Sequence, residues 1–441
     1  MTAFTTLPDS PRFTLTDATL PAVLVKGFSA PAREGLVHAD IVIASGRIEK
    51  ILPAGSVPTD AVVADMPGVD LKGGMVWPCF ADMHTHLDKG HIWDRRRNPD
   101  GSFMGALLNV REDREKNWSA DDVRTRMEFS LKTAYAHGTK LIRTHLDSIP
   151  PQPRISFPVF SDMRAEWKGR IDLQAVALFP MEMIWEEAFF TDLVSVVAEH
   201  GGLLGGVPQM WPDLDARLDL LMRTAADKGL DIDLHVDETE DKQVLALEKV
   251  AEAKLRNRFQ GAVTVGHCCS LARQDDEVAK RVVDKVAEAG LSVVSLPMCN
   301  MYLQDRHAGR TPRWRGVTLF HELAAAGVRI AVSSDNTRDP FYAYGDMDPV
   351  EVFREAVRIL HLDHPLNTSA RVVTSTPAEI LGRPDIGIIA EGGPADLVLF
   401  SARRWSEFLS RPQADRIVMR NGKGIDRRLP DYRDLDPILD K

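Results

Sequence analysis

The sequence predicts an α/β fold: a (β/α)8 barrel of the TIM type with a small β-domain built from the N- and C-terminal segments. Three observations predict it. From about residue 70, short apolar strands alternate with amphipathic helices. Side chains that can bind a metal stand where several of these strands end. Both ends of the chain instead carry short strands separated by Gly and Pro turns. Strand–helix alternation is typical of a parallel sheet covered by helices.

The strand candidates of the barrel follow one another in this order: VWPCFADMHTH, TKLIRTHLDS, IDLQAVALFP, GLLGGVPQM, LDIDLHVDE, GAVTVGHCCS, LSVVSLPMCN and VRIAVSSDN. Amphipathic helices lie between several of them. One is predicted to begin at Ser119, where SADD resembles a capping box, and to end near Gly138. Another ends at Gly229, and DDEVAKRVVDKVAEAG and LFHELAAAG repeat the pattern. Eight strand-then-helix units therefore predict a closed barrel.

The barrel is expected to span residues 71–384. Residues 1–70 and 385–441 are expected to form one β-domain, since both segments show short strands with turn residues. The last stretch, DRRLPDYRDLDPILDK, is predicted to be a surface tail.

Composition excludes several classes of function. A chain of 441 residues with a net charge of −10 is a poor partner for nucleic acid. Its first residues lack the basic and apolar regions of a secretory signal, and no apolar run approaches the roughly 20 residues of a membrane helix. The four cysteines form no C-x-x-C pair, so a reducing cytoplasm is the expected compartment. The oligomeric state stays open, a homo-oligomer included.

The stretch PCFADMHTHLDKG places His84 and His86 one residue apart at the end of an apolar run. In a strand, residues i and i+2 point to the same face, so the two imidazoles would lie side by side. Such a pair can hold a metal ion or can simply be polar residues on a wet surface. The pair alone does not decide between them, and the motif needs partners elsewhere in the chain.

Partners stand at other strand ends. The second strand ends in THLD, the fifth in HVDE, the sixth in HCC and the eighth in SDN. Active sites of such barrels lie at the carboxyl ends of the strands. Independent polar residues at loop starts are the alternative interpretation, but their concentration at one rim favours a shared site.

The residues of this rim suit a metal-dependent hydrolase. Three imidazoles and one carboxylate would bind the ion: His84, His86, His235 and Asp335. Nitrogen and oxygen ligands suit Zn²⁺ or Fe²⁺, and such an ion lowers the pKa of water towards about 7. Glu238, three residues after His235, is placed to carry a proton. His267 could polarise the attacked bond or stabilise a tetrahedral intermediate. This set predicts a hydrolytic centre for carbon–nitrogen bonds, with Glu238, His267 and Asp335 as catalytic residues.

The combination HTHLDK, THLD, HVDE, GHCCS and SSDNTRDPF resembles the amidohydrolase superfamily, and within it the cytosine deaminase-like branch. The resemblance covers nearly the whole chain, including TSTPAEILG and GGPADLVLF near its end. It implies the same four metal ligands, Glu238 as the proton shuttle and His267 at the attacked substituent. Two-metal members carry a carboxylated lysine at the end of strand three or four. Here those ends read FPMEM and VPQM, so one divalent ion per chain, Zn or Fe, is expected.

The departures from the branch concern the substrate. Met181 stands where cytosine deaminases carry a ring-reading glutamine, Asn336 where they carry a second aspartate, and Phe341 where they carry a tryptophan. Losing a polar reader removes the hydrogen bonds that favour cytosine, so another heterocycle is expected. HTHLDK and SDNTRD also resemble the N-isopropylammelide isopropylaminohydrolases, which release an alkylamine. That enzyme type carries aspartate where this chain has Glu238, which favours the deaminase.

Other residues are candidate substrate contacts, each with a purely structural alternative. Lys89 could contact a substrate carbonyl or pair with Asp88, and His145 could touch substrate or make a structural hydrogen bond. Gln209 is a candidate for the missing amide reader, and Phe341 for a flat wall of the pocket. Arg95, Arg96 and Arg97 are interpreted as a solvated loop face rather than an anion site.

The sequence therefore predicts a mononuclear metal-dependent aminohydrolase that deaminates an amino-substituted N-heterocycle, a small molecule. The alternatives are release of an alkylamine, opening of a ring amide and, from a different class, a catalytically silent barrel that only binds.

Overall fold

The computed structural model describes residues 4–56 and 66–439. The chain divides into two compact units. The first comprises Met1–Ala81, Lys132–Leu141 and Asp348–Leu429. The second comprises Asp82–Leu131, Ile142–Met347 and Pro430–Lys441. Strands and helices occur in both, so the predicted α/β class is confirmed.

The first unit is built on a sheet to which both ends of the chain contribute. Its strands are β1 (Arg12–Pro21), β3 (Leu36–Ala44), β4 (Arg47–Pro53), β5 (Gly68–Asp70), β6 (Met75–Pro78), β15 (Leu397–Phe400), β16 (Ile417–Arg420) and β17 (Lys423–Gly424). They are ordered β17-β16-β15-β6-β1-β3-β4, with β5 beside β1. β15 pairs antiparallel with β6, so that Val398 lies opposite Trp77. A two-stranded ribbon joins β2 (Val25–Lys26) to β14 (Ile389–Ala390).

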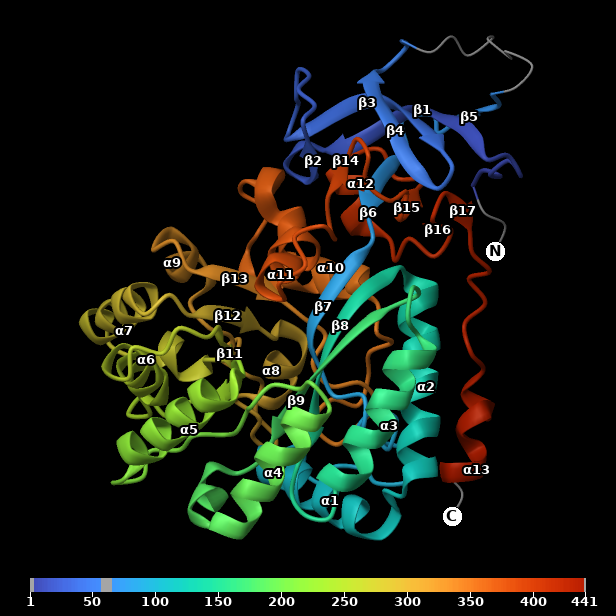
Figure 1. Cartoon of the computed structure of the whole chain (residues 1–441). Coiled ribbons are helices and arrows are strands. Elements are labelled where there is room, and N and C mark those ends of the chain that lie inside the picture. Colours follow the sequence, from blue (N-terminus) through green and yellow to red (C-terminus); the bar gives the residue numbers. More distant parts are fainter. Residues whose placement is uncertain (1–3, 57–65, 440–441) are drawn as a thin grey trace. The chain divides into compact units, whose positions relative to one another are not determined.

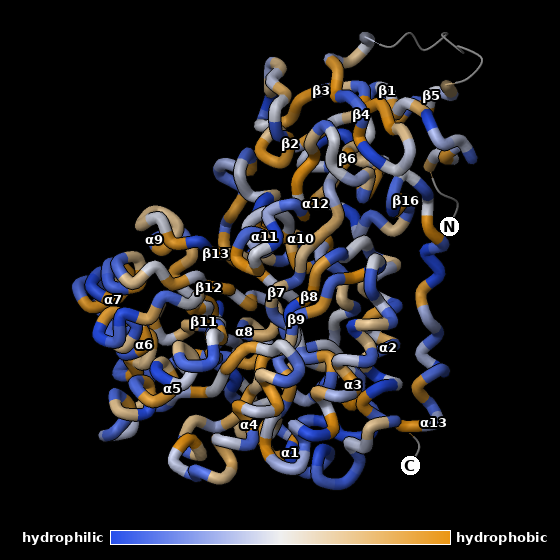
Figure 2. The backbone as a smooth tube through the Cα atoms, viewed as in Figure 1, coloured by the Kyte–Doolittle hydropathy of each residue, from blue (hydrophilic) through white to orange (hydrophobic). Residues whose placement is uncertain are grey.

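Apolar side chains on this sheet make the core of the first unit. Phe13 and Leu15 of β1 pack with Ile41 and Ile43 of β3, and Leu397 of β15 belongs to the same cluster. Residues two apart on a strand share one face, which explains the spacing of these pairs. Figure 2 shows β3 largely in hydrophobic colours.

Short helices complete the first unit: η1 (Ala22–Leu24), α10 (Pro349–Leu360), η4 (Leu366–Val373), α11 (Ser375–Ile380) and α12 (Trp405–Ser410). The side chain of Asp348 caps α10 by accepting a hydrogen bond from the Val350 amide, and Pro349 occupies the first turn.

The second unit contains a series of parallel strands: β7 (Phe80–Thr85), β8 (Thr139–Asp147), β9 (Asp172–Leu178), β10 (Ile232–Val236), β11 (Val263–His267), β12 (Ser292–Ser295) and β13 (Arg329–Val332). They form the sheets β7-β8-β9 and β10-β11-β12-β13. Parallel bridges from segment 203–207 reach Val176 on one side and Ile232 on the other. A further parallel bridge joins Thr85 to Asp335, just beyond β13, so the series of pairings returns to β7 (Figure 1).

Two strand predictions need correction. The run VWPCFADMHTH is not one strand but two, β6 and β7, separated at Cys79. Pro78 cannot donate a ladder hydrogen bond, and the Cys79 amide donates to Asp396 instead. The run GLLGGVPQM forms isolated bridges rather than a regular strand. Its glycines leave no side chain to pack, and a Cβ on Gly205 would stand 2.2 Å from the carbonyl oxygen of Ala177.

The helices assigned mainly to the second unit are α1 (Phe103–Asn117), α2 (Ala120–His137), α3 (Pro153–Glu166), η2 (Met181–Trp185), α4 (Glu187–Glu199), α5 (Leu214–Lys228), α6 (Ala246–Arg256), η3 (Cys269–Arg273), α7 (Asp276–Glu288), α8 (Pro297–Leu303), α9 (Phe320–Ala325), η5 (Tyr432–Leu435) and α13 (Asp436–Leu439). The predicted ends are confirmed: α2 starts after Ser119, and α5 ends at Gly229 in the left-handed conformation, φ +64°. α5, α6 and α7 lie side by side (Figure 1), and much of α7 is coloured hydrophilic in Figure 2. Within the described ranges, no helix combines the length and apolar character needed to cross a bilayer.

The predicted surface tail is wrong in part. Leu435 and Ile438 are buried against Phe129 of α2, and Arg95 donates to the carbonyl of Ile438. Apolar residues three apart on a helical turn share one face, which lets this short segment dock.

The arginine run also differs from the solvated loop face that was expected. The Arg95 side chain is 6% exposed and pairs with Asp113 and Asp122, while Arg96 pairs with Glu112. Asp113 lies in α1 and Asp122 in α2, so Arg95 connects its loop to both helices through ion pairs.

Candidate active site

Five of the predicted site residues lie at strand ends of the second unit. His84 belongs to β7, and His86 comes directly after that strand. His235 lies in β10, and His267 is the last residue of β11. Asp335 follows β13, and its amide donates to the carbonyl of His84 at 2.9 Å. Parallel strands bring their carboxyl ends to one edge, which is why residues so distant in sequence meet here.

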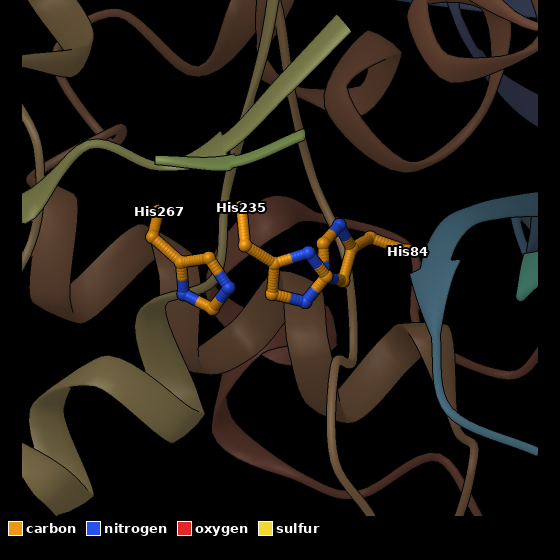
Figure 3. A group of neighbouring side chains, drawn as sticks. All are labelled: His84, His235 and His267. Atoms are coloured by element: carbon orange, nitrogen blue, oxygen red, sulfur yellow. The ribbon is translucent and has the colours of Figure 1, made fainter. Parts of the chain in front are cut away.

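The four predicted ligands converge. Nε2 of His235 lies 3.2 Å from Nε2 of His84 and 3.3 Å from Nε2 of His86. Oδ1 of Asp335 lies 3.2 Å from Nε2 of His86 and 3.6 Å from Nε2 of His84. All four side chains are buried. Three imidazole nitrogens and one carboxylate oxygen therefore point at one small volume (Figure 3 shows His84 and His235 together with His267).

The electrostatics of this cluster fit a cation. Burial lowers the pKa of His84, His86 and His235 well below the usual value, so the imidazoles are neutral and offer lone pairs. Burial raises the pKa of Asp335 to about 7. When the Nε2 atoms of these neutral imidazoles carry no proton, their lone pairs and the oxygens of the buried carboxylate face one another without a donor between them. A divalent ion would satisfy all four atoms, and this donor set suits Zn²⁺ or Fe²⁺.

Glu238 and His267 lie together beside this cluster. Oε1 of Glu238 is 3.4 Å from Nδ1 of His267. Burial, with the charge of Asp335 added, raises the pKa of Glu238 well above its ordinary value, against the opposing effect of Lys89. A carboxyl group with a raised pKa can hold a proton near neutral pH and give it up again, which is what a general acid and base requires.

A residue that sequence analysis missed joins these two. Nδ2 of Asn300, in α8, donates to Oε1 of Glu238 at 3.1 Å and lies 3.0 Å from Nδ1 of His267. Asn300 is fully buried. The signal that could have found it is a single amide in the otherwise apolar run LPMCNMYL, directly after a strand.

Lys89 is buried rather than exposed. Its ammonium lies 3.4 Å from Oδ1 of Asp147 and 4.9 Å from the centre of the Phe341 ring. Burial lowers the pKa of Lys89, but the carboxylates, Asp147 and Asp339 foremost, outweigh it and raise the pKa. A charged donor beside an aromatic wall is a suitable neighbour for a flat, polar ring.

Asn336 and His145 also lie near the cluster. Nδ2 of Asn336 donates to Oδ2 of Asp339 at 2.7 Å, and its Oδ1 accepts from Cys299 at 3.5 Å. The His145 ring centre lies 4.0 Å from that of His84, and Nε2 of His145 is 3.8 Å from Oδ1 of Asp233.

The remaining candidates differ from one another. Phe341 is 7% exposed and packs edge-on against Phe103 of α1. Met181 is fully buried, with the end of its side chain beside Gly206. Gln209, by contrast, is exposed, so the structure does not bring this proposed amide reader into the buried group.

Two site residues have a backbone conformation that is unfavourable for side-chain-bearing residues. His267 has φ +69° and Asp335 has φ +63°. Such positions cost about 1–3 kcal/mol each and cluster at functional sites, because the surrounding structure must hold them in place.

Gly266, next to His267, is required by the His84 ring. A Cβ at Gly266 would stand 2.8 Å from Cε1 and 3.1 Å from Nδ1 of His84. Gly266→Ala is therefore expected to displace this ring and to weaken metal binding by at least about 10-fold, since small misplacements of site groups have large effects. Titration of the metal-free variant with Zn²⁺ measures this. Gly68→Ala, at a strand glycine with open space, is the control, and unchanged affinity in Gly266→Ala would contradict the close fit.

Comparisons with known proteins place this geometry in a family. The model of the amidohydrolase family matches residues 176–423. The chain is 71% identical over 437 residues to pterin deaminase of Rhizobium rhizogenes strain K84, covering 99% of each chain.

The chain belongs to the amidohydrolase family. Members of this family are metal-dependent, which agrees with the convergent histidines and aspartate.

More distant relatives match nearly the whole length of the chain. N-isopropylammelide isopropyl amidohydrolase of Pseudomonas sp. strain ADP is 26% identical over 88% of this chain and 93% of its own. The solved structure of 5-methylcytosine deaminase from Klebsiella pneumoniae, liganded with phosphonocytosine, is 25% identical, with a TM-score of 0.80 over 94% of this chain and 98% of that one. The predicted resemblance to the cytosine deaminase-like branch is confirmed.

The predicted class of enzyme is also confirmed. The chain is a hydrolase of carbon–nitrogen bonds other than peptide bonds, and the 71% relative supports hydrolytic deamination of an amino-substituted N-heterocycle by an amidohydrolase. The alternative of a silent binding barrel loses its support.

Proposed function

We propose that this chain is a pterin deaminase, which replaces the exocyclic amine of a 2-amino-4-oxopteridine with oxygen and releases ammonia. The observation that carries the proposal is 71% identity, over 99% of both chains, to a protein of that name. The buried site agrees with it, because an acid–base carboxyl group stands beside a group of ligands that can hold a metal.

One divalent ion, Zn²⁺ or Fe²⁺, would be held by three imidazoles and one carboxylate: His84, His86, His235 and Asp335. When bound, such an ion lowers the pKa of water and so supplies a nucleophile at neutral pH. A single ion is proposed because the ends of the third and fourth strand segments, FPMEM and VPQM, offer no lysine.

The protein's own groups move the protons. Glu238 takes one proton from the attacking water and gives it to the ring nitrogen next to the attacked carbon. Asp335 accepts the second proton of the water, and Glu238 passes this proton on to the amine. The carbon–nitrogen bond then breaks, ammonia leaves, and the new carbon–oxygen bond becomes the carbonyl of the product. His267 donates to the oxygen of the tetrahedral centre, where charge develops.

The substrate ring is proposed to lie against Phe341, with its carbonyl oxygen near Lys89. We also propose His145, Met181, Gln209 and Asn336 as substrate contacts; of these four, Gln209 is exposed. A buried ammonium that hydrogen-bonds a carbonyl contributes more to binding than a neutral donor does.

Lys89→Met is accordingly expected to lower kcat/KM for pterin about 10- to 100-fold, which corresponds to losing one hydrogen bond from a charged donor. Asp147 keeps its other partner, Arg114, at 2.9 Å, so the fold should survive. Steady-state kinetics test this, with Lys280→Met on the exposed face of α7 as the control. Unchanged kcat/KM would exclude Lys89 from substrate recognition.

The architecture proposed for this function is the closed (β/α)8 barrel. The circuit of parallel pairings from β7 through segment 203–207 and β13 back to β7 supports it. We propose that residues 71–384 form this barrel and that residues 1–70 and 385–441 form the β-domain. The four cysteines are free and buried, which fits the proposed cytoplasmic location.

The proposed function is tested by product release from metal-reconstituted protein. Pterin, cytosine, 5-methylcytosine and N-isopropylammelide are supplied in parallel, and ammonia and isopropylamine are measured. We expect ammonia from pterin, with kcat/KM at least about 100-fold above that for cytosine. Isopropylamine from N-isopropylammelide without ammonia from pterin would overturn the proposal in favour of alkylamine release.

A further inference from the structure

Asn300 connects the two groups that the proposed mechanism uses for proton transfer and charge stabilisation. It lies in the middle of α8, and its amide donates to the carbonyl of Leu296, which helps to hold it in the helix. Its side chain is fully buried between Glu238 and His267. We propose that Asn300 is a positioning residue, which holds His267 with its proton on Nε2 and orients the carboxylate of Glu238. The expected effect on kcat rests on the proposed function, whereas the expected tautomer of His267 does not.

The contacts of the amide group determine the direction of its hydrogen bonds. Nδ2 of Asn300 lies 3.1 Å from Oε1 of Glu238 and 3.0 Å from Nδ1 of His267. An amide nitrogen has two hydrogens and no lone pair to share, so it donates to both atoms. If the amide were turned around, its oxygen would face Oε1 of Glu238, and two acceptors would be in contact whenever this carboxyl group is ionised.

The tautomer of His267 follows from this direction. Nδ1 can accept a hydrogen bond only if it carries no proton, so the proton of the neutral ring is on Nε2. Nε2 is buried and has no hydrogen-bond partner among the described residues. The ring lies in a row with those of His235 and His84 (Figure 3), and one of its nitrogens lies within 4.8 Å of nitrogens of both.

The Nε2–H of His267 is thus a donor aimed beside the ligand cluster, where the attacked carbon and its new oxygen would lie. The other tautomer would present a lone pair to an oxygen that gains negative charge, which is repulsive. Asn300 acts through His267 and Glu238 and need not touch the substrate. Its loss should therefore lower kcat more than it changes KM.

The tautomer can be measured without turnover. Histidine-¹⁵N-labelled protein, metal-free and metal-loaded, is compared by NMR with Asn300→Ala and Asn300→Asp, and the His267 resonances are assigned from the spectrum of His267→Gln. Imidazole ¹⁵N shifts distinguish a protonated from a bare nitrogen. We expect a bare Nδ1 and a protonated Nε2 in the wild type. Asn300→Asp should move the proton to Nδ1, because a carboxylate accepts there instead of donating.

Kinetics give the second readout. Asn300→Ala and Asn300→Asp are expected to lower kcat for pterin about 10- to 100-fold, with KM changed less than about threefold and with metal content kept. Asn367→Asp, at an exposed position of η4, is the matched control with expected wild-type kinetics.

A protonated Nδ1 in the wild type, or a tautomer unchanged in Asn300→Asp, overturns the positioning role whatever the substrate is. Wild-type protein that fails to deaminate pterin while showing the expected tautomer overturns the proposed function and leaves the positioning role intact. If the variants do not fold, the wild-type spectrum alone still decides the tautomer.

Discussion

Glu238→Gln is expected to lower kcat about 10³-fold while leaving metal content unchanged. A positioned acid and base contributes about 10²- to 10⁴-fold, and glutamine cannot exchange protons in this role. The substitution preserves shape, and the glutamine oxygen can still accept from Asn300, whose Nδ2 lies 3.1 Å from Oε1. The raised pKa of Glu238, caused first by burial, makes it suited to hold the proton that the amine must receive.

The measurement is single-turnover ammonia release together with metal analysis of the same preparation. Glu240→Gln, two residues further on and exposed, is the matched control and should behave as wild type. A Glu238→Gln protein with near-native turnover would show that another group moves the proton. Loss of metal in that variant would instead indicate that Glu238 binds the ion.

Strand and helix periodicity predicted most of the second unit, because apolar strands bounded by glycine or proline have few alternative structures. The failures lie where tertiary contacts override the local pattern. The break at Cys79 depends on a hydrogen bond that the Cys79 amide donates to the carbonyl of Asp396, more than 300 positions away. The docking of Leu435 and Ile438 depends on a partner, Phe129, that no local window contains.

The metal ligands were predictable because each stands directly at a strand end, and parallel strand ends meet at one edge. Contacts that come from helices and loops were not predictable in the same way. Asn300 reaches Glu238 from α8, and the buried Lys89 contacts Asp147 and Phe341, which lie far from it in the sequence. The side-chain direction that decides such roles is set by packing, which spacing in the sequence does not record.

His235→Ala is expected to abolish both metal retention and deamination. His235 is the residue whose Nε2 approaches both His84 and His86, at 3.2 and 3.3 Å, so removing it takes away the central nitrogen donor. Loss of a hydrogen-bonding neighbour of a ligand already weakens metal binding about 10- to 100-fold, and loss of the ligand itself should exceed that. After dialysis, metal content should fall from one ion per chain to near zero.

Wild-type protein treated with a chelator should lose deamination and recover it when Zn²⁺ or Fe²⁺ is added, whereas His235→Ala should not recover at the same concentration. The ion that restores the higher kcat identifies the better cofactor. His200→Ala is the control, because His200 lies at the end of α4 and contacts Ser161 rather than the cluster. A His235→Ala protein that binds one ion with wild-type affinity would contradict the ligand assignment, because the imidazole of His235 would then not be needed to hold the ion.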